Sequence, residues 1–189
     1  MQKKVILFLA DGFEEVEALT PVDYLRRAGI EVTTVSVSAN PAVRGAHGIP
    51  VMADSTLTEL AGLGRSGAKS WDGVLLPGGM PGASNIAASE GASALLREMA
   101  GAGKLVCAIC ASPAVVLAPL GLLAGRRFTC FPGMEEKVSG ARWSGDRVVV
   151  DGNIITSRAA GTAGAWAAAI IGKLAGENEA KKLAQSVLL

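Results

Sequence analysis

The chain has 189 residues, the length of one domain with a sizeable core, and half of its residues are hydrophobic. Its net charge is +1 and it has no block of basic residues, so we expect no nucleic-acid partner. Gly and Pro interrupt every apolar run before it reaches membrane-spanning length, so we expect no membrane association.

The cysteine and histidine content limits the compartment and the cofactors. Three cysteines without the spacing of a disulfide framework indicate a reducing compartment, and we expect a cytoplasmic protein. The N-terminal segment enters a strand pattern and soon reaches Asp11, unlike a signal peptide. A single histidine, His47, does not fit a zinc or non-haem iron site, and we expect no metal and no other cofactor.

The first half of the chain predicts strands and helices in alternation. A short apolar run ends at Asp11-Gly12, and the helix that follows carries carboxylates in its first turn and ends at Gly29. Pro21 either bends this helix or restarts it. The predicted strands are residues 5–9, 31–38, 49–52 and 74–76, and a further helix covers residues 89–100.

The second half continues this pattern. The predicted strands are residues 105–109, 129–131, 147–150 and 154–155, the last two joined by a hairpin turn at 151–153. An alanine-rich helix runs to Leu174, and an amphipathic helix covers residues 177–187. Because most strands are apolar throughout, we expect an α/β fold with a parallel sheet covered on both faces. No repeat or linker divides the chain, so residues 1–189 form one domain.

Cys110 follows directly after an apolar strand and precedes a predicted helix. Ser112 is the expected N-cap and Pro113 the first helical residue. A sharp turn of this kind requires small residues two positions before and after it, and Ala108 and Ser112 are both small. The helix N-terminus would favour a thiolate at Cys110, which makes this cysteine a candidate nucleophile. The alternative is a buried structural cysteine.

Other segments also leave strand ends, where ligands bind in doubly wound sheets. The N–H groups of Gly78, Gly79 and Ala111 could stabilise an oxyanion on a carbonyl attacked by Cys110, although Gly-Gly also suits an ordinary turn. An acid beside a thiolate should stay protonated and transfer protons. Residue pattern alone does not distinguish Glu14, Glu15 and Glu17 for this role.

Several motifs together resemble the DJ-1/PfpI (ThiJ) family over essentially the whole chain. They are Ala10-Asp11-Gly12-Phe13-Glu14-Glu15-Val16-Glu17, Leu76-Pro77-Gly78-Gly79, Ala108-Ile109-Cys110-Ala111 and Ser157-Arg158 before Gly161-Thr162. The resemblance implies a flavodoxin-like, doubly wound, mostly parallel sheet in a three-layer sandwich, and a homodimer. It also implies that Cys110 is an oxidisable cysteine held by a protonated Glu17, with Gly79 and Ala111 as hydrogen-bond donors. The implied dimer interface lies near Asp23, Arg26 and Arg27.

Three positions differ from other members of that family. Phe131 stands where some eukaryotic members have a histidine, as in the bacterial YajL-type branch. His47 replaces an arginine that reaches the partner's site, and it either contacts substrate or is an ordinary loop histidine. Ala159-Ala160 replaces the usual Gly-Pro, which would change the rim of the pocket.

The resemblance leaves two functions open. One is cofactor-independent glyoxalase or deglycase chemistry on a small aldehyde or dicarbonyl substrate such as methylglyoxal or glyoxal, or on early glycation adducts. The other is a redox sensor or chaperone in which Cys110 is oxidised to a sulfinate. A Cys-His peptidase or amidotransferase is excluded, because no histidine follows Cys110 in the chain.

Overall fold

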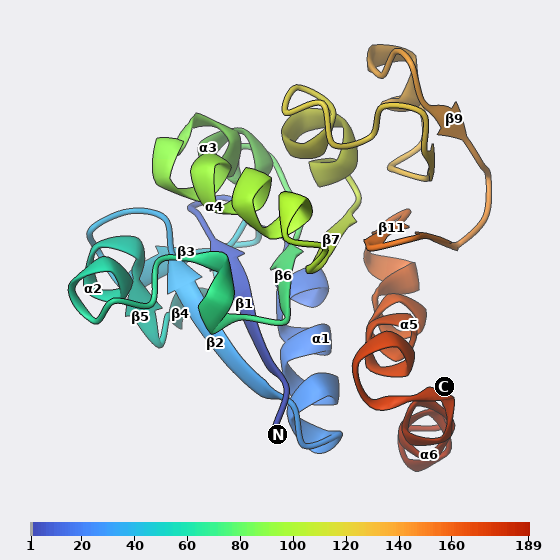
Figure 1. The fold of residues 1–189 in the computed structure, drawn as a ribbon, viewed down its shortest axis with the longest axis horizontal. Coiled ribbons are helices and arrows are strands. Elements are labelled where there is room, and N and C mark those ends of the chain that lie inside the picture. The colour runs from blue at the N-terminus through green and yellow to red at the C-terminus, as the bar shows by residue number, and fades with distance from the viewer. Residues whose placement is uncertain (1) are drawn as a thin grey trace.

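The computed structural model describes residues 2–189 and contains a seven-stranded central sheet in the order β10-β11-β7-β6-β1-β2-β5 (Figure 1). Every neighbouring pair is parallel except the β10–β11 hairpin, so the predicted mostly parallel, doubly wound sheet is confirmed. The strands are β1 (Lys4–Leu9), β2 (Glu31–Ser36), β5 (Ser55–Thr56), β6 (Gly73–Leu76), β7 (Leu105–Ile109), β10 (Val148–Asp151) and β11 (Ile154–Ser157).

Helices cover both faces of this sheet, which gives the expected three layers (Figure 1). One face packs against α1 (Glu15–Arg27), α5 (Ala163–Ala175) and α6 (Glu177–Ser186). The other packs against α2 (Leu57–Gly62), α3 (Gly82–Ala88), α4 (Glu90–Gly101) and the short helices η1 (Ala68–Ser70) and η2 (Pro113–Leu117). Alternate side chains of β1 enter the two cores, because successive side chains of a strand point to opposite faces. None of the described helices is long and apolar enough to cross a membrane.

Local sequence signals explain where several elements begin and end. The Ser89 side chain accepts a hydrogen bond from the Ala92 N–H and caps α4. Gly29, with φ of +75°, follows the end of α1 as predicted. Pro21 does not restart α1, which is one continuous helix around it. The helix α3 was not among the predicted elements.

The predicted strand at residues 129–131 was wrong. A short strand, β8 (Arg127–Phe128), lies just before it and pairs with β9 (Arg142–Trp143). The Thr129 N–H instead donates to the Thr156 hydroxyl at 2.9 Å, and the Phe131 N–H donates to the carbonyl oxygen of Cys110 at 2.8 Å. These two hydrogen bonds connect the segment to the end of the central sheet, and the segment does not pair with another strand among the described residues.

The remaining short elements lie outside the central sheet. A hairpin of β3 (Ala42–Arg44) and β4 (Pro50–Met52) follows β2, and only β4 was predicted as a strand. Two 3-10 helices, η3 (Glu135–Lys137) and η4 (Ala160–Thr162), lie in the C-terminal third. The loops that follow β1, β6, β7 and β11 leave the sheet at its carboxyl edge, where doubly wound folds bind ligands.

Candidate functional site

Cys110 lies in a sharp turn between β7 and η2. Its φ is +63°, a left-handed conformation that is uncommon for a residue with a side chain. The turn is held from both sides, because the Cys110 N–H donates to the carbonyl oxygen of Ser157 at 3.0 Å and its own carbonyl accepts from Phe131. The sulfur-bearing side chain is therefore fixed at the carboxyl edge of the sheet and remains partly exposed.

Ser112 has a different role from the predicted N-cap. Its backbone is already helical, and its side chain caps no N–H group. Instead its buried hydroxyl donates to the carbonyl oxygen of Pro77 at 2.5 Å. This bond joins the Cys110 turn to the loop after β6. Pro113 is the first residue of η2, a π-helical turn, as expected of its position.

Glu17 reaches the same place from the first turn of α1. The Gly78 N–H donates to Glu17 Oε2 at 2.8 Å, and the Glu14 N–H donates back to the Gly78 carbonyl oxygen at 3.0 Å. The Glu17 side chain is completely buried, and its Oε1 has no N–H or O–H partner among the described residues. Among the three glutamates that residue pattern left open, the structure therefore places Glu17 beside the cysteine.

The carboxyl and the thiol oppose each other's ionisation. Burial raises the pKa of Glu17 to about 7, although the hydrogen bond from the Gly78 N–H acts in the opposite direction. Burial and then the charge of Glu17 raise the pKa of Cys110 to about 12, although N–H groups of Gly79 and Ala111 lower it. The N–H groups at the start of the helix thus favour a thiolate as predicted, but burial and Glu17 outweigh them. Because two negative charges disfavour each other here, the pair retains at least one proton at neutral pH.

The three small residues around the sulfur have separate roles. The Gly78 N–H is occupied by Glu17, so it does not serve as the predicted oxyanion donor. The N–H groups of Gly79 and Ala111 face the Cys110 sulfur and remain the candidate donors. Gly79 has φ of +85°, and a Cβ there would overlap the backbone of residues 12–14. Only glycine fits this position.

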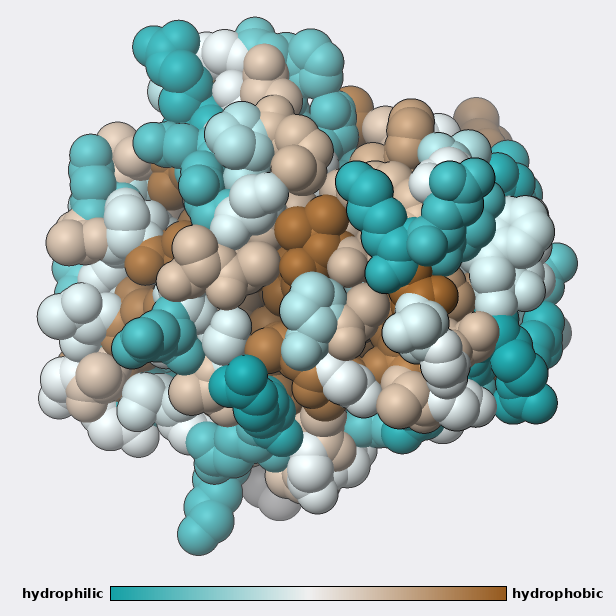
Figure 2. Space-filling view, turned by 90° about the horizontal axis from the view of Figure 1, so that it is seen from above, coloured by the Kyte–Doolittle hydropathy of each residue, from teal (hydrophilic) through white to brown (hydrophobic). Residues whose placement is uncertain are grey.

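A cavity of about 460 Å³ opens next to Cys110. Seen onto the carboxyl edge of the sheet, hydrophobic residues gather in a central band between hydrophilic side chains (Figure 2). The cavity has mainly apolar walls and one basic residue at its rim, Lys137. It is lined by Gly79, Met80, Cys110, Ala111, Phe131, Pro132, Gly133, Met134 and Lys137. No sequence signal identified Met80, Met134 or Lys137, because they come from loops without a motif.

His47 does not line this cavity. Its ring Nδ1 lies 2.8 Å from Glu15 Oε2, and its backbone N–H donates to Glu15 Oε1 at 2.8 Å. The hydrogen bond with Glu15, followed by the charge of Glu14, raises the pKa of His47. Glu14, Glu15 and His47 carry metal-ligand atoms within 4.8 Å of one another. Both oxygens of the buried Glu15 already bind this loop, so the structure favours the alternative of a loop histidine that ties residues 45–49 to α1.

The three residues of the expected dimer interface lie on and near the outer part of α1. Arg27 Nε contacts Asp23 Oδ2 at 2.7 Å within the helix, and both side chains are more than half exposed. Arg26 bridges to Asp54 at 2.8 Å and to the Val32 carbonyl oxygen at 2.9 Å. These contacts are compatible with an exposed helix face, and its use between two copies stays a prediction.

Comparison with known proteins identifies the family. The model of the DJ-1/PfpI family matches residues 3–173. The chain belongs to the DJ-1/PfpI family. It is 39% identical over 186 residues to DJ-1 homolog A of Arabidopsis thaliana, covering 98% of this chain but only 46% of that longer protein. A Pyrococcus abyssi protein named a deglycase is 33% identical, covering 86% of this chain and 94% of its own length.

A solved structure in this family has the same architecture. The structure of oxidised DJ-1 from Toxoplasma gondii is 36% identical, covers 98% of both chains and superposes with a TM-score of 0.92. The flavodoxin-like fold expected for a DJ-1/PfpI protein is thereby confirmed. The Glu17, Gly78 and Cys110 arrangement described above lies inside the part of the chain that the family model matches.

The raised pKa of Glu17 predicts a pH dependence of stability. Its pKa is about 7 in the folded chain and near 4.5 when exposed, so the folded state holds the extra proton between these values. The free energy of unfolding should therefore fall as pH rises from 4.5 to 7, because ionising Glu17 costs more in the fold. Urea unfolding at several pH values should show this fall in the wild type and not in Glu17→Gln.

Glu136→Gln, which removes an exposed carboxyl, is the control for a general loss of charge. It should lose stability over the same pH interval as the wild type. Equal pH profiles for Glu17→Gln and the wild type would contradict the assignment of this proton to Glu17.

A methyl group at Gly78 should damage the site. A Cβ there would lie 2.6 Å from Cys110 Cβ and 2.8 Å from Glu17 Oε2, closer than carbon atoms pack. We expect Gly78→Ala to lower the free energy of unfolding by about 1–3 kcal/mol and to slow alkylation of Cys110 by iodoacetamide. Gly101→Ala is the matched control, because its Cβ would point into open space at the end of α4. Equal behaviour of the two variants would show that Gly78 does not set the contact.

Proposed function

We propose that this protein is a cofactor-independent enzyme that converts small dicarbonyls, such as methylglyoxal and glyoxal, to hydroxy acids. The observation that carries this proposal is a partly exposed cysteine that shares a proton with a buried glutamate at the floor of an apolar cavity. A nucleophile, a proton carrier and two N–H donors are the groups that an aldehyde rearrangement needs. The deglycase name of the archaeal relative supports chemistry on early glycation adducts as a related activity of the same site.

The first step begins when the shared proton lies on Glu17 and the sulfur is a thiolate. The sulfur of Cys110 forms a bond to the aldehyde carbon, and the carbonyl π electrons move to oxygen. The N–H groups of Gly79 and Ala111 stabilise this oxygen, and Glu17 supplies its proton to give a hemithioacetal. Glu17 is then a carboxylate next to the new carbon–sulfur bond.

The second stage moves hydrogen within the bound substrate. Glu17 removes the proton from the former aldehyde carbon, giving an enediolate, and returns it to the neighbouring carbon, while the hydroxyl proton on the first carbon moves to the oxygen of the second. The product is a thioester of the hydroxy acid on Cys110. Water hydrolyses this thioester and releases the acid and the thiol, so methylglyoxal and water give lactate. No external oxidant or reductant is consumed.

Turnover of methylglyoxal tests this proposal, with lactate measured by a chirally resolved assay. Cys110→Ser should lose at least about 10³-fold in kcat/KM, because it removes the nucleophile. Glu17→Gln should lose about 10²–10⁴-fold, the usual contribution of a general acid–base. Cys130→Ala, which changes a cysteine outside the cavity, is the control and should retain activity. The absence of lactate above the buffer rate in the wild type would refute the enzyme.

A redox role for the same cysteine is the second candidate, favoured by the oxidised state in which the Toxoplasma gondii relative is described. Here the thiolate attacks peroxide, forming an S–O bond as the O–O bond breaks, and a second peroxide converts the sulfenate to a sulfinate. The Glu17 carboxyl and the N–H groups of Gly79 and Ala111 would bind the new oxygens.

Intact mass and peptide mapping after mild peroxide treatment test the redox role. Two added oxygens on Cys110 are expected, because its side chain is partly exposed, and Cys107 and Cys130 should remain reduced because both are fully buried. Glu17→Gln should slow formation of the sulfinate, because glutamine cannot accept the thiol proton that leaves when the thiolate forms. Equal oxidation of all three cysteines would count against a specific sensor.

A further inference from the structure

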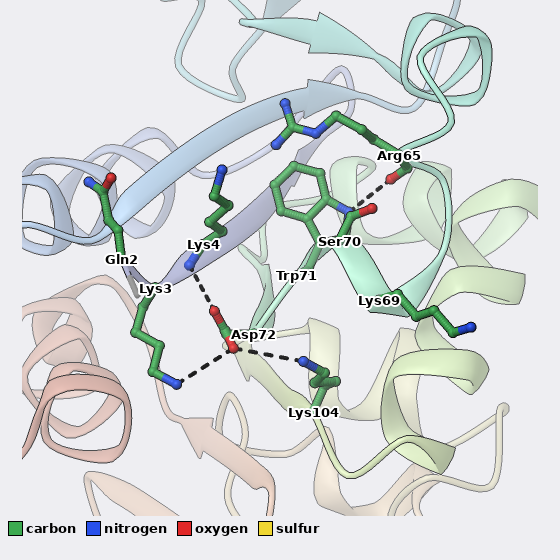
Figure 3. A pocket seen from close by; sticks show the side chains of 9 residues that line it. All are labelled: Gln2, Lys3, Lys4, Arg65, Lys69, Ser70, Trp71, Asp72 and Lys104. Carbon is green, nitrogen blue, oxygen red and sulfur yellow. Dashed lines mark hydrogen bonds and ion pairs between the residues drawn. The ribbon is translucent and has the colours of Figure 1, made fainter.

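A second cavity lies at the opposite edge of the sheet, where β1, β6 and β7 begin (Figure 3). Its volume is about 500 Å³, and its lining is mainly basic. Five cationic side chains surround it, from the first residues of the chain, the loop between α2 and β6, and the residue before β7. They are Lys3, Lys4, Arg65, Lys69 and Lys104. Segments far apart in the sequence thus bring their positive charges to one place.

The charge of this cavity is not balanced by the carboxylates near it. Asp72 lines the cavity, and Glu31 lies beside it, within 3.5 Å of Arg65 and 3.1 Å of Lys4. Five cations and one carboxylate line the cavity, and Glu31 and Glu98 lie nearby, so this surface keeps an excess of positive charge, whereas the whole chain has a net charge of only +1. A concave surface with one sign of charge attracts an ion of the other sign.

The lysine donors around Asp72 are held near one another without being used up. Lys3 Nζ lies 3.6 Å and Lys104 Nζ 3.7 Å from Asp72 Oδ1, both longer than a good hydrogen bond. The other carboxylate oxygen, Oδ2, accepts from the backbone N–H of Lys4 at 3.0 Å. In Figure 3 the side chains of Lys3 and Lys104 approach Asp72 from two sides, while Lys69 points away at the rim. Asp72 therefore gathers two amines whose protons remain available to a ligand.

Arg65 is more rigidly placed than an ordinary surface arginine. Its guanidinium lies over the ring of Trp71, 4.7 Å from the ring centre, and the Trp71 Nε1–H donates to the Arg65 carbonyl oxygen at 3.0 Å. Trp71 itself is buried, so it fixes both the backbone and the side chain of Arg65. The only carboxylate contact of this guanidinium among the described residues is the 3.5 Å approach to Glu31. The N–H donors of the Arg65 guanidinium are therefore held in position to bind a ligand.

We propose that this cavity binds a small anion that carries two phosphoryl groups. A planar arginine fork with several lysines matches phosphate, which has more charge and more acceptor oxygens than a carboxylate. The cavity is larger than one phosphate ion needs. The site is separate from the Cys110 chemistry, which lies at the other end of the same strands.

Isothermal titration calorimetry with pyrophosphate on the full chain tests the proposal, at a fixed ionic strength set by chloride. Saturable binding at one site per chain is expected. Arg65→Gln and Lys104→Gln should each weaken it at least about tenfold, because each removes a charged hydrogen bond to phosphate. Lys181→Gln, an exposed lysine of α6, is the matched control and should bind like the wild type. Parallel titrations with ADP and fructose 1,6-bisphosphate distinguish a nucleotide from a sugar phosphate as the source.

A second measurement uses the wild type alone and so does not depend on whether the variants fold. In the wild type, pyrophosphate should shift the NMR signal of the Trp71 indole N–H, because Trp71 lies directly beneath Arg65. The indole signals of Trp143 and Trp166, which do not line this cavity, should stay in place. No saturable binding, or a loss that Lys181→Gln shares equally, would overturn the proposal and leave the lysines as ion pairs between strand ends.

Discussion

The contact between Glu17, Gly78 and Cys110 is the constraint on which the active part of this molecule depends. The Gly78 N–H fixes one carboxyl oxygen, and the missing Cβ of Gly78 leaves room for both the carboxyl and the cysteine. Burial then keeps the pair from carrying two negative charges. Reactivity follows from where one proton lies, because moving it from sulfur to Glu17 creates the nucleophile and the acid at once.

The fold positions this contact through the ends of three strands. The loop after β1 leads into α1 and Glu17, the loop after β6 carries Gly78, and β7 ends at Cys110. The left-handed turn at Cys110 is a strained conformation, and the bonds to Ser157 and Phe131 hold it. The segment that was wrongly predicted as a strand therefore has a structural role, since its Phe131 N–H supports the turn and its Thr129 N–H bonds to β11.

Much of this arrangement could be predicted from the sequence, and the limits have physical causes. Apolar runs and turn residues located most of the central strands, because burial and backbone freedom are local properties. Residue pattern could not choose Glu17 over its neighbours, since that choice depends on a hydrogen bond to Gly78, 61 residues away. The effect of the helix end on the Cys110 pKa could be predicted from the sequence, whereas the larger and opposite effect of desolvation is set by the packed fold.

The same limit applies to charge. The sequence has no basic block, yet the parallel sheet places the starts of β1, β6 and β7 side by side, and their flanking cations converge there. The carboxyl edge needs a site without such cations, because a lysine or arginine in contact with Glu17 would lower its pKa and keep the shared proton on sulfur. Burial, the Gly78 N–H, Cys110 and Glu14 are instead the main influences on that pKa. Because the central strands are parallel, the Glu17–Cys110 pair lies at their carboxyl ends and the basic cavity lies at their amino ends.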